Sequence, residues 1–290
     1  MPLSWQLLRV TVPAAHVERF QALLTSLSTL GVEERPADGE PWQVSQPWEE
    51  APSQPHRPEQ VELLAYFEHS QDDEARAAQV QHAASYVPGA SVAVGSMTEG
   101  DWEERWRSSF VPLEIAPGVV IAPPWDPRPG ALIIEPGAAF GTGQHPTTLA
   151  CLRAVARYAR PGQTLLDVGC GTGVLALLGA SRGMTAYGVD CDPQAIQASA
   201  ANGRRNDLGC CFDTRSVGTL TGSYDLVVAN IYAEVLVRMA GDLKRLTGRR
   251  LVLAGILADR AHRVVRAMSP LAPSRKAQDG DWVSMEFLRP

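Results

Sequence analysis

The chain has 290 residues, 45% of them hydrophobic, and no apolar run approaches the roughly 20 residues that a membrane-spanning helix needs, so no membrane span is expected. Its net charge of −6 is uneven, because residues 1–110 hold 7 Lys and Arg against 17 Asp and Glu (−10), whereas residues 111–290 hold 19 against 15 (+4). An acidic first half argues against general nucleic-acid binding, and it suits either a basic partner or a solvated surface that aids solubility.

The first 98 residues show the hydrophobic spacing of a small α+β unit. We expect Gly31 to end a first helix and Ser70 to cap a second one, with a proline-rich surface loop at 36–58 between them. The resulting order of elements is compatible with a ferredoxin-like sandwich. In chain order, the spacing predicts a strand at 5–12, a helix at 14–30, a strand at 61–69, a helix at 70–86 and a strand at 90–97.

A short connector follows at residues 99–112. Trp102, Trp106 and Phe110 recur every four residues, which places the three rings on one face of a helix. We interpret this segment as a linker helix packed between two domains. Direct contact of the aromatic rings with a partner is the alternative that the spacing leaves open.

From residue 113 to residue 290, predicted strands alternate with helices, which is typical of a parallel sheet covered on both faces. Asp192 and Pro193 are a favourable helix start, because Asp accepts from the first backbone N–H groups and Pro suits the first helical position. Asp259 is expected to cap a later helix. The strands are predicted at 163–169, 185–192, 210–214, 224–232, 249–257 and 281–288.

Two glycine-rich loops, EPGAAFGTGQHPTT at 135–148 and LLDVGCGTG at 165–173, suggest one ligand held from two sides. Val174 stands where a dinucleotide fold requires its third glycine, and neither loop has the Gly-Lys-Ser/Thr of a phosphate loop. Asp190 lies 21 residues after Gly169 at a predicted strand end. A carboxylate there suits an adenosyl ligand, whose ribose hydroxyls donate to it.

These segments resemble a known family. Both loops, together with VDCDPQAIQASAAN and VVANIYAEVL, are similar to class I S-adenosylmethionine-dependent methyltransferases, and among them to the PrmA-type enzymes that methylate large-subunit ribosomal protein eleven. The similarity runs from about residue 101 to the closing DWVSMEFL, whereas across residues 1–98 only the layout is alike. Cys170 inside the glycine turn and the long loop at 36–58 depart from the family pattern.

The resemblance implies an α/β fold in three parts. Residues 113–290 are expected to form a Rossmann-like, doubly wound methyltransferase domain that binds S-adenosylmethionine. Residues 1–98 are expected to form a small ferredoxin-like α+β domain that recognises the substrate, joined by the linker helix at 99–112.

The resemblance also implies roles for single residues. Asn230 is expected to orient the acceptor nitrogen without a dedicated base. His145 is interpreted as a helix-start residue rather than a base or metal ligand, because no second His or Cys lies at ligand spacing, and Thr147 as structural. No metal is expected. The residues expected to bind the cofactor are Phe140, Gly141, Thr148, Gly169, Gly171, Asp190 and Asn230.

The implied function is transfer of methyl groups to lysine side-chain amines, N-terminal amines or both, on a basic ribosomal large-subunit protein. A methyltransferase for RNA or a small molecule is the alternative, although NIYA at 230–233 differs from the Asn-Pro-Pro-Tyr often seen in adenine or glutamine methylation. A cofactor-binding module without turnover is the non-enzyme alternative.

The remaining expectations concern surroundings and partners. We expect a cytoplasmic monomer that makes no direct contact with nucleic acid. The N-terminus lacks the basic and apolar segments of a signal peptide. A reducing compartment suits the five cysteines, which lack metal-type pairing: Cys151, Cys170, Cys191, Cys210 and Cys211.

Overall fold

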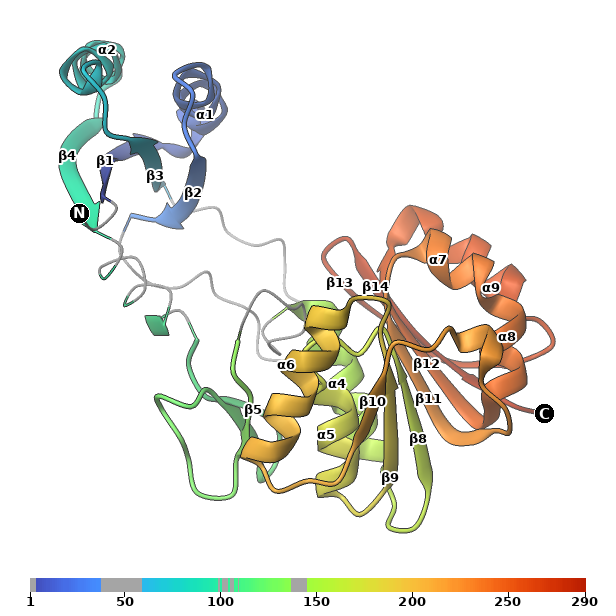
Figure 1. Cartoon of the computed structure of the whole chain (residues 1–290). Coiled ribbons are helices and arrows are strands. Elements are labelled where there is room, and N and C mark those ends of the chain that lie inside the picture. The colour runs from blue at the N-terminus through green and yellow to red at the C-terminus, as the bar shows by residue number, and fades with distance from the viewer. Residues whose placement is uncertain are drawn as a thin grey trace. The chain divides into compact units, whose positions relative to one another are not determined.

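The structure is a computed structural model, and it divides into two compact units, Met1–Arg107 and Ser108–Pro290. Each unit is described by itself (Figure 1). The predicted helix around Trp102 and Trp106 and most of the proline-rich loop lie outside the described residues. The described residues are 4–37, 59–98, 100, 104, 107, 108, 110–136 and 145–290.

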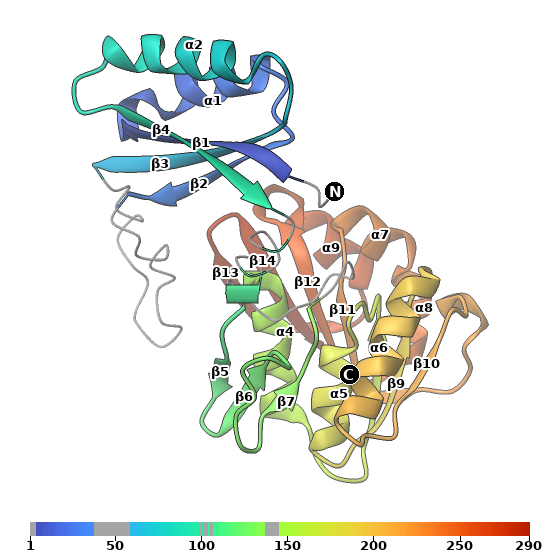
Figure 2. The same cartoon turned by 60° about the vertical axis from the view of Figure 1, so that its left-hand side comes forward.

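The first unit is a four-stranded antiparallel sheet in the order β2-β3-β1-β4, with two helices on one face (Figure 2). Leu8, Val10 and Phe20 are fully buried between the sheet and the helices. This is the expected ferredoxin-like arrangement. Its elements are β1 (Ser4–Pro13), η1 (Ala14–His16), α1 (Val17–Ser26), β2 (Gly31–Pro36), β3 (Gln60–Glu68), α2 (Asp73–Ser85) and β4 (Ser91–Thr98).

Two local predictions in this unit were wrong, and one strand was not predicted. The first helix ends at Ser26, and Gly31 opens strand β2, which the sequence pattern did not reveal. The Ser70 side chain does not cap α2; the helix begins after Asp72, whose backbone N–H donates to Ser70 Oγ. Strand β2 was missed because its sequence, GVEERP, does not alternate between apolar and polar residues and runs into the proline-rich stretch.

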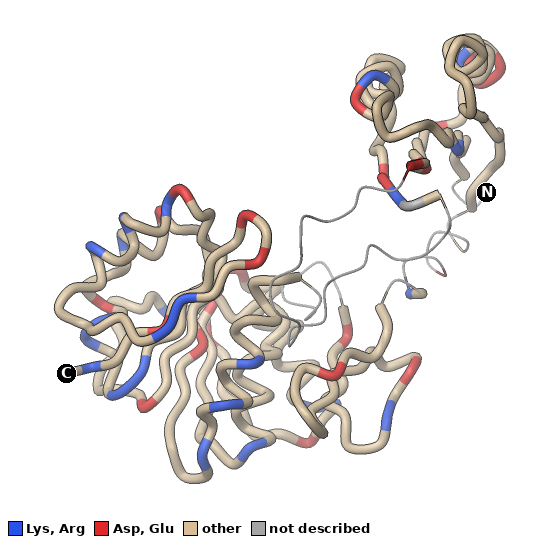
Figure 3. The backbone as a smooth tube through the Cα atoms, turned by 180° about the vertical axis from the view of Figure 1, so that it is seen from behind, with Lys and Arg blue, Asp and Glu red and all other residues tan. Residues whose placement is uncertain are grey.

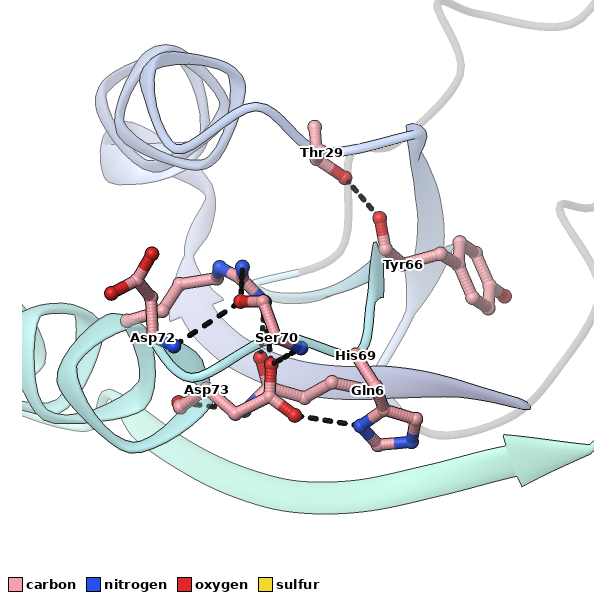
Figure 4. Close-up of polar contacts among 8 residues, drawn as sticks. Gln6, Thr29, Tyr66, His69, Ser70, Asp72 and Asp73 are labelled. Carbon is pink, nitrogen blue, oxygen red and sulfur yellow. Dashed lines mark hydrogen bonds and ion pairs between the residues drawn. The ribbon is translucent and has the colours of Figure 1, made fainter. Parts of the chain in front are cut away.

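A polar network fixes the start of α2 to strand β1 (Figure 4). The Asp73 carboxylate accepts from the Ser70 backbone N–H at 3.0 Å, lies 2.6 Å from His69 Nδ1 and is paired with Arg76 at 3.2 Å. Gln6 of β1 donates to the Asp73 carbonyl at 2.8 Å and accepts from Arg76 at 2.7 Å. The hydrogen bond from His69, followed by that from Ser70, holds the pKa of Asp73 below its usual value despite partial burial.

The second unit contains a seven-stranded sheet in the order β10-β9-β8-β11-β12-β14-β13. The first five strands are parallel, and β14 is antiparallel to both of its neighbours. This confirms the predicted doubly wound sheet. The strands are β8 (Thr164–Val168), β9 (Thr185–Val189), β10 (Cys211–Asp213), β11 (Tyr224–Asn230), β12 (Thr247–Leu257), β13 (Ala272–Asp279) and β14 (Trp282–Leu288).

Helices cover both faces of this sheet (Figure 1). One face carries α4 (Pro146–Tyr158), α5 (Val174–Ser181) and α6 (Pro193–Arg205), and the other carries α7 (Ala233–Arg238), α8 (Ala240–Leu246) and α9 (Ala261–Met268). A separate three-stranded sheet comprises β5 (Leu113–Ala116), β6 (Val119–Ala122) and β7 (Leu132–Ile133). Two short 3-10 turns are η2 (Val217–Thr219) and η3 (Ala258–Arg260).

The predicted helix starts had mixed outcomes. Asp192 caps α6, since its side chain accepts from the Gln194 backbone N–H at 2.8 Å, with Pro193 at the first helical position. Asp259 does not cap α9, because it lies within η3 and the helix starts at Ala261. Strand β13 was missed because all eight of its residues are exposed, so no hydrophobic alternation marks it. No helix in the described ranges is long and apolar enough to cross a membrane.

The sheet order places the ends of β8 and β11 side by side, although the chain leaves them toward opposite edges of the sheet. In open α/β sheets a crevice forms at this switch point, outside the carboxyl ends of the strands. The residues that follow β8, β9 and β11 therefore surround one location.

We predict that Asp73→Asn destabilises α2 by about 1 kcal/mol at pH 7, because Asn loses the charge that His69 and Arg76 contact. The pKa of Asp73 is lowered in the fold, so its contribution is present above the pKa of the unfolded chain, near 4, and is lost as pH falls through the lower folded value. The gap between parent and variant should therefore close in acid. Hydrogen exchange of the α2 amides measures this gap.

Asp72→Asn is the control, because the Asp72 side chain makes no capping hydrogen bond. Equal effects of the two substitutions at pH 7 would contradict the role given to Asp73.

Candidate functional site

The turn after β8 is a tight loop that only glycine fits. Gly169 has φ +74°, and a Cβ there would lie 2.6 Å from Ile231 Cγ2. Gly173, at the start of α5, has φ +80°, and its Cβ would lie 2.7 Å from the Cβ of Ser199. Because L side chains rarely adopt such φ values, both positions need glycine, and the backbone stays open to a ligand.

Asp190, directly after β9, faces this turn. One carboxylate oxygen accepts from the Gly171 backbone N–H at 3.0 Å, and the other accepts from the Asp192 N–H at 3.0 Å. A carboxylate has about four lone-pair positions, so these two bonds leave acceptor capacity for a diol. Asp190 therefore connects the first two strand ends and retains the ability to bind ribose hydroxyls.

Asp167, the penultimate residue of β8, precedes the glycine loop and is fully buried. One carboxylate oxygen accepts from the Ala176 N–H at 3.2 Å, and the other has no hydrogen-bond partner. Burial raises the pKa of Asp167 to about 7, against the lowering effect of the Ala176 hydrogen bond, and the nearby Asp190 adds to the rise. A second carboxyl group, with a raised pKa, therefore lies close to Asp190 behind the wall of the site.

Asn230 ends β11 on the other side of the glycine turn. Its side-chain nitrogen donates to the hydroxyl of Thr148, a buried residue in the first turn of α4, at 3.1 Å. The side-chain oxygen of Asn230 is buried and has no partner. An unpaired buried acceptor is costly, so this oxygen is poised for a donor from a bound molecule.

The start of α4 borders the same region. His145 is its N-cap, with Nδ1 accepting from the Thr147 backbone N–H at 3.4 Å and lying 2.7 Å from the Thr147 hydroxyl, and Pro146 is at the first helical position. The His145 ring packs edge-on against Trp282, with 5.2 Å between ring centroids. Burial lowers the pKa of His145, which opposes use of its ring as a cation.

These elements enclose a cavity of about 740 Å³, a size typical of ligand sites. The cavity is lined by residues at the carboxyl ends of β8, β9, β10 and β11 and at the starts of α4 and β14. Its walls are His145, Thr147, Val168, Gly169, Gly171, Val189, Asp190, Cys191, Asp192, Ala195, Thr214, Arg215, Ser216, Val217, Asn230, Ile231, Tyr232, Val235, Met239, Gly255 and Trp282.

The cavity brings together four residues that the sequence singled out, namely Gly169, Gly171, Asp190 and Asn230. Thr148 is not among the wall residues; it lies behind Asn230 and positions that side chain. Phe140 and Gly141 lie outside the described residues. Within the part of the chain that the structure describes, no three His, Cys, Asp or Glu side chains are grouped as in a metal site.

Sequence reasoning missed several walls of the cavity. Residues 214–217 follow the short strand β10, and Tyr232 follows Asn230, so a rule about strand ends would have found both. Trp282 could not be found this way, because it begins an antiparallel strand far along the chain. The combined geometry suits a ligand with a diol for Asp190, a part that contacts the glycine backbone, and a donor for Asn230.

Comparison with known proteins gives consistent results. The family model of ribosomal protein L11 methyltransferase (PrmA) matches residues 4–290. A ribosomal protein L11 methyltransferase of Thermus thermophilus is 41% identical over 65% of this chain and 78% of its own length. One from Geobacter metallireducens is 34% identical and covers 97% of both chains.

A solved structure has a similar fold. The crystal structure of a ribosomal protein L11 methylase from Lactobacillus delbrueckii subsp. bulgaricus superposes with a TM-score of 0.58 at 24% identity. The match covers 62% of this chain and 99% of that one. At this identity the likeness supports the fold.

We predict that Asp167→Asn removes a pH dependence from the stability of this unit. The folded pKa of about 7 lies above the unfolded value, so the folded parent holds a proton between about pH 4 and 7 that the unfolded chain lacks. Its stability therefore falls as pH rises through this window. From pH 5 to pH 8 the Asn variant should gain about 2–3 kcal/mol relative to the parent.

Urea unfolding at the two pH values measures this gain. Asp126→Asn, an exposed substitution in the same unit, controls for the loss of a carboxylate. If the difference in unfolding free energy between Asp167→Asn and the parent is the same at pH 5 and pH 8, the pKa of Asp167 is not raised.

Proposed function

The chain belongs to the ribosomal protein L11 methyltransferase family, and we propose that it transfers methyl groups from S-adenosylmethionine to lysine side-chain amines, N-terminal amines or both on that protein. The membership confirms the resemblance seen in the motifs. The observation that carries the choice of acceptor is the unpaired, buried oxygen of Asn230 in a cavity bounded by Asp190 and the glycine turn. An amine N–H is a donor that this oxygen accepts from.

The residues present fit the cofactor. Asp190 would accept from the ribose hydroxyls, and the open backbone from Gly169 to Gly171 would lie against the amino-acid portion, where a Cβ would close the space. The cofactor supplies an activated methyl group on a cationic sulfonium. The protein's own task is therefore to bind, to exclude water and to align the acceptor.

The acceptor nitrogen needs a free lone pair. A lysine with pKa ~10.4 held neutral at pH 7 costs about 4.6 kcal/mol, and a partly dry site beside a cation lowers this amount by disfavouring the ammonium form. Asn230 accepts from the neutral amine and so aims its lone pair, while Thr148 holds the Asn230 amide in place. No dedicated base is then required.

Recognition of the protein substrate is assigned to the first unit, residues 1–98 in the predicted division. Acidic and basic side chains are interspersed along both units (Figure 3), but residues 1–110 carry a net charge of −10. Opposite charge accelerates encounter with a basic protein and repels nucleic acid. We extend the proposal to a monomer that acts in the cytoplasm, on a basic substrate and without direct contact to nucleic acid.

Intact-mass analysis of ribosomal proteins from cells with and without this chain tests the function. The mass of ribosomal protein L11 should drop by multiples of one methyl group in cells that lack the chain, and fragmentation should place the methyl groups on lysine or N-terminal nitrogen. Methyl groups at other atoms would contradict the amine assignment. Cofactor binding without any change in mass would favour the binding module.

We predict that Asp190→Ala weakens S-adenosylmethionine binding at least tenfold, since two hydrogen bonds to a carboxylate contribute about 1.5–3 kcal/mol each. Titration calorimetry measures the affinity. The control is Asp192→Asn, because Asn also caps helices and the Asp192 side chain is bonded to the α6 backbone. Unchanged affinity of Asp190→Ala would refute the ribose contact.

We also predict that association with ribosomal protein L11 slows as salt is added, since exposed charges are screened over ~8 Å at physiological ionic strength. Removing three exposed carboxylates of the first unit, with Glu68→Gln, Asp72→Asn and Glu74→Gln, should slow association at low salt and flatten the salt dependence. Asp73 is left intact because of its structural network. Stopped-flow mixing measures the rates.

The matched control removes three carboxylates of the second unit, the exposed Asp207 and Asp259 and the partly exposed Asp126, with Asp126→Asn, Asp207→Asn and Asp259→Asn. If both triple variants change the rate equally, the first unit has no special part in attracting the substrate. A rate that stays flat with salt would leave solubility as the role of the acidic surface.

A further inference from the structure

The hairpin between β13 and β14 brings acidic residues to the cavity. Asp279 and Trp282 are directly paired across the hairpin, with Gly280 and Asp281 as the turn between them. Directly paired residues on adjacent strands have Cβ atoms about 4.5–5.5 Å apart. Because Trp282 is a wall of the cavity, the Asp279 side chain lies at its margin.

Two further observations fix the position of this turn. The Ala258 backbone N–H donates to the Asp281 carbonyl at 2.9 Å, which ties the turn to the segment after β12. The charge of Asp279 acts on His145, where it opposes the lowering of the His145 pKa by burial. Asp279 is therefore close to the ring that packs on Trp282. The charge of Asp279 also acts on Arg153 of α4.

Tyr232 stands at the margin of the cavity. It precedes α7, two residues after Asn230, and 72% of it is exposed, although it is also a wall of the cavity. Leu257 of β12, paired with Trp282, is exposed as well. The Tyr232 ring is therefore accessible at the edge of the cavity, where a molecule entering it can contact the ring face.

We propose that Tyr232 and Trp282, with Asp279 and Asp281 beside Trp282, form the acceptor entrance of the cavity and select an alkylammonium group. This deepens the proposed function and rests on it. Aromatic faces attract ammonium groups through the negative potential of the ring, and the attraction strengthens when water is excluded. The carboxylates add attraction for a cation and repel anions such as phosphate groups.

The entrance separates binding of the charged ammonium ion from methylation of the neutral amine. The substrate nitrogen arrives as an ammonium ion, which the aromatic rings and carboxylates bind at the exposed rim. The ammonium loses its proton to solvent water as the nitrogen leaves this rim for Asn230, where burial disfavours the charged form and the neutral amine keeps its lone pair. A thioether, an alcohol or an amide would gain nothing from this rim, so the selection is for amines.

The deciding variant is Tyr232→Leu, because a residue this exposed is removed with little effect on folding. It should raise KM for ribosomal protein L11 at least fivefold and leave the Kd for S-adenosylmethionine within a factor of two. Tyr232→Phe, which keeps the ring, should behave like the parent. An unchanged KM in Tyr232→Leu, or an equal rise in Tyr232→Phe, would overturn the role of the ring.

The carboxylates are tested in the same way. Asp279→Asn with Asp281→Asn should raise KM for the protein substrate at least threefold and leave the cofactor Kd unchanged. The control pair, Asp126→Asn with Asp207→Asn, removes the same charge from a partly exposed and an exposed position, neither of which is a wall of the cavity. Equal changes in the two pairs would overturn a local role for the hairpin.

A binding measurement separates this inference from the proposed function. Titration with butylammonium chloride should shift the indole N–H signal of Trp282 in NMR spectra, and neutral 1-pentanol should not. The shift should be reduced in Tyr232→Leu. An inactive parent that still binds butylammonium would refute the proposed function alone, whereas an active parent with equal responses to both compounds would refute the entrance.

Discussion

The cavity depends on how closely the backbone after β8 approaches the residue after β11. At Gly169 that approach leaves no room for a Cβ, because Ile231 would lie 2.6 Å from it. The two strands are neighbours in the sheet, so their ends cannot move apart without breaking the ladder between them. Glycine at this point lets both ends coexist and leaves backbone uncovered beside Asp190 and Asn230. Without it, the turn, the carboxylate and the amide would not share one cavity.

Polar groups around this turn divide into those that are satisfied and those that are not. Asp190 is held by two backbone N–H groups, so its position is fixed before any ligand binds. The Asn230 amide is fixed by Thr148, yet its oxygen is unpaired. Asp167 also has an unpaired oxygen, and burial raises the pKa of its carboxyl group to about 7. Asn230 is a wall of the cavity, where a bound molecule can pair with its oxygen, whereas Asp167 is not among the wall residues.

The two units differ in how their sheets are covered and in what their charged residues do. The second unit buries a parallel sheet on both faces, which makes the strand ends rigid enough to hold a small ligand. The first unit is an antiparallel sheet with helices on one face, whose acidic residues at the start of α2 are partly structural, as Asp73 is, and partly exposed, as Asp72 and Glu74 are. Not every acidic residue of the first unit is therefore accessible to a partner.

Hydrophobic periodicity, glycine spacing and strand ends are local properties of the chain, so the class of fold, the glycine turn and the strand-end positions of Asp190 and Asn230 could be predicted before the structure was known. The sequence also identified the family, through motifs that lie within single loops. It did not find β2 or β13, whose residues lack a buried alternating face. The support of Asn230 by Thr148, and the presence of Tyr232 and Trp282 in the walls of one cavity, followed only from the three-dimensional arrangement. These contacts join residues from 50 to more than 80 positions apart, and only the sheet order, set by packing of the whole core, brings them together.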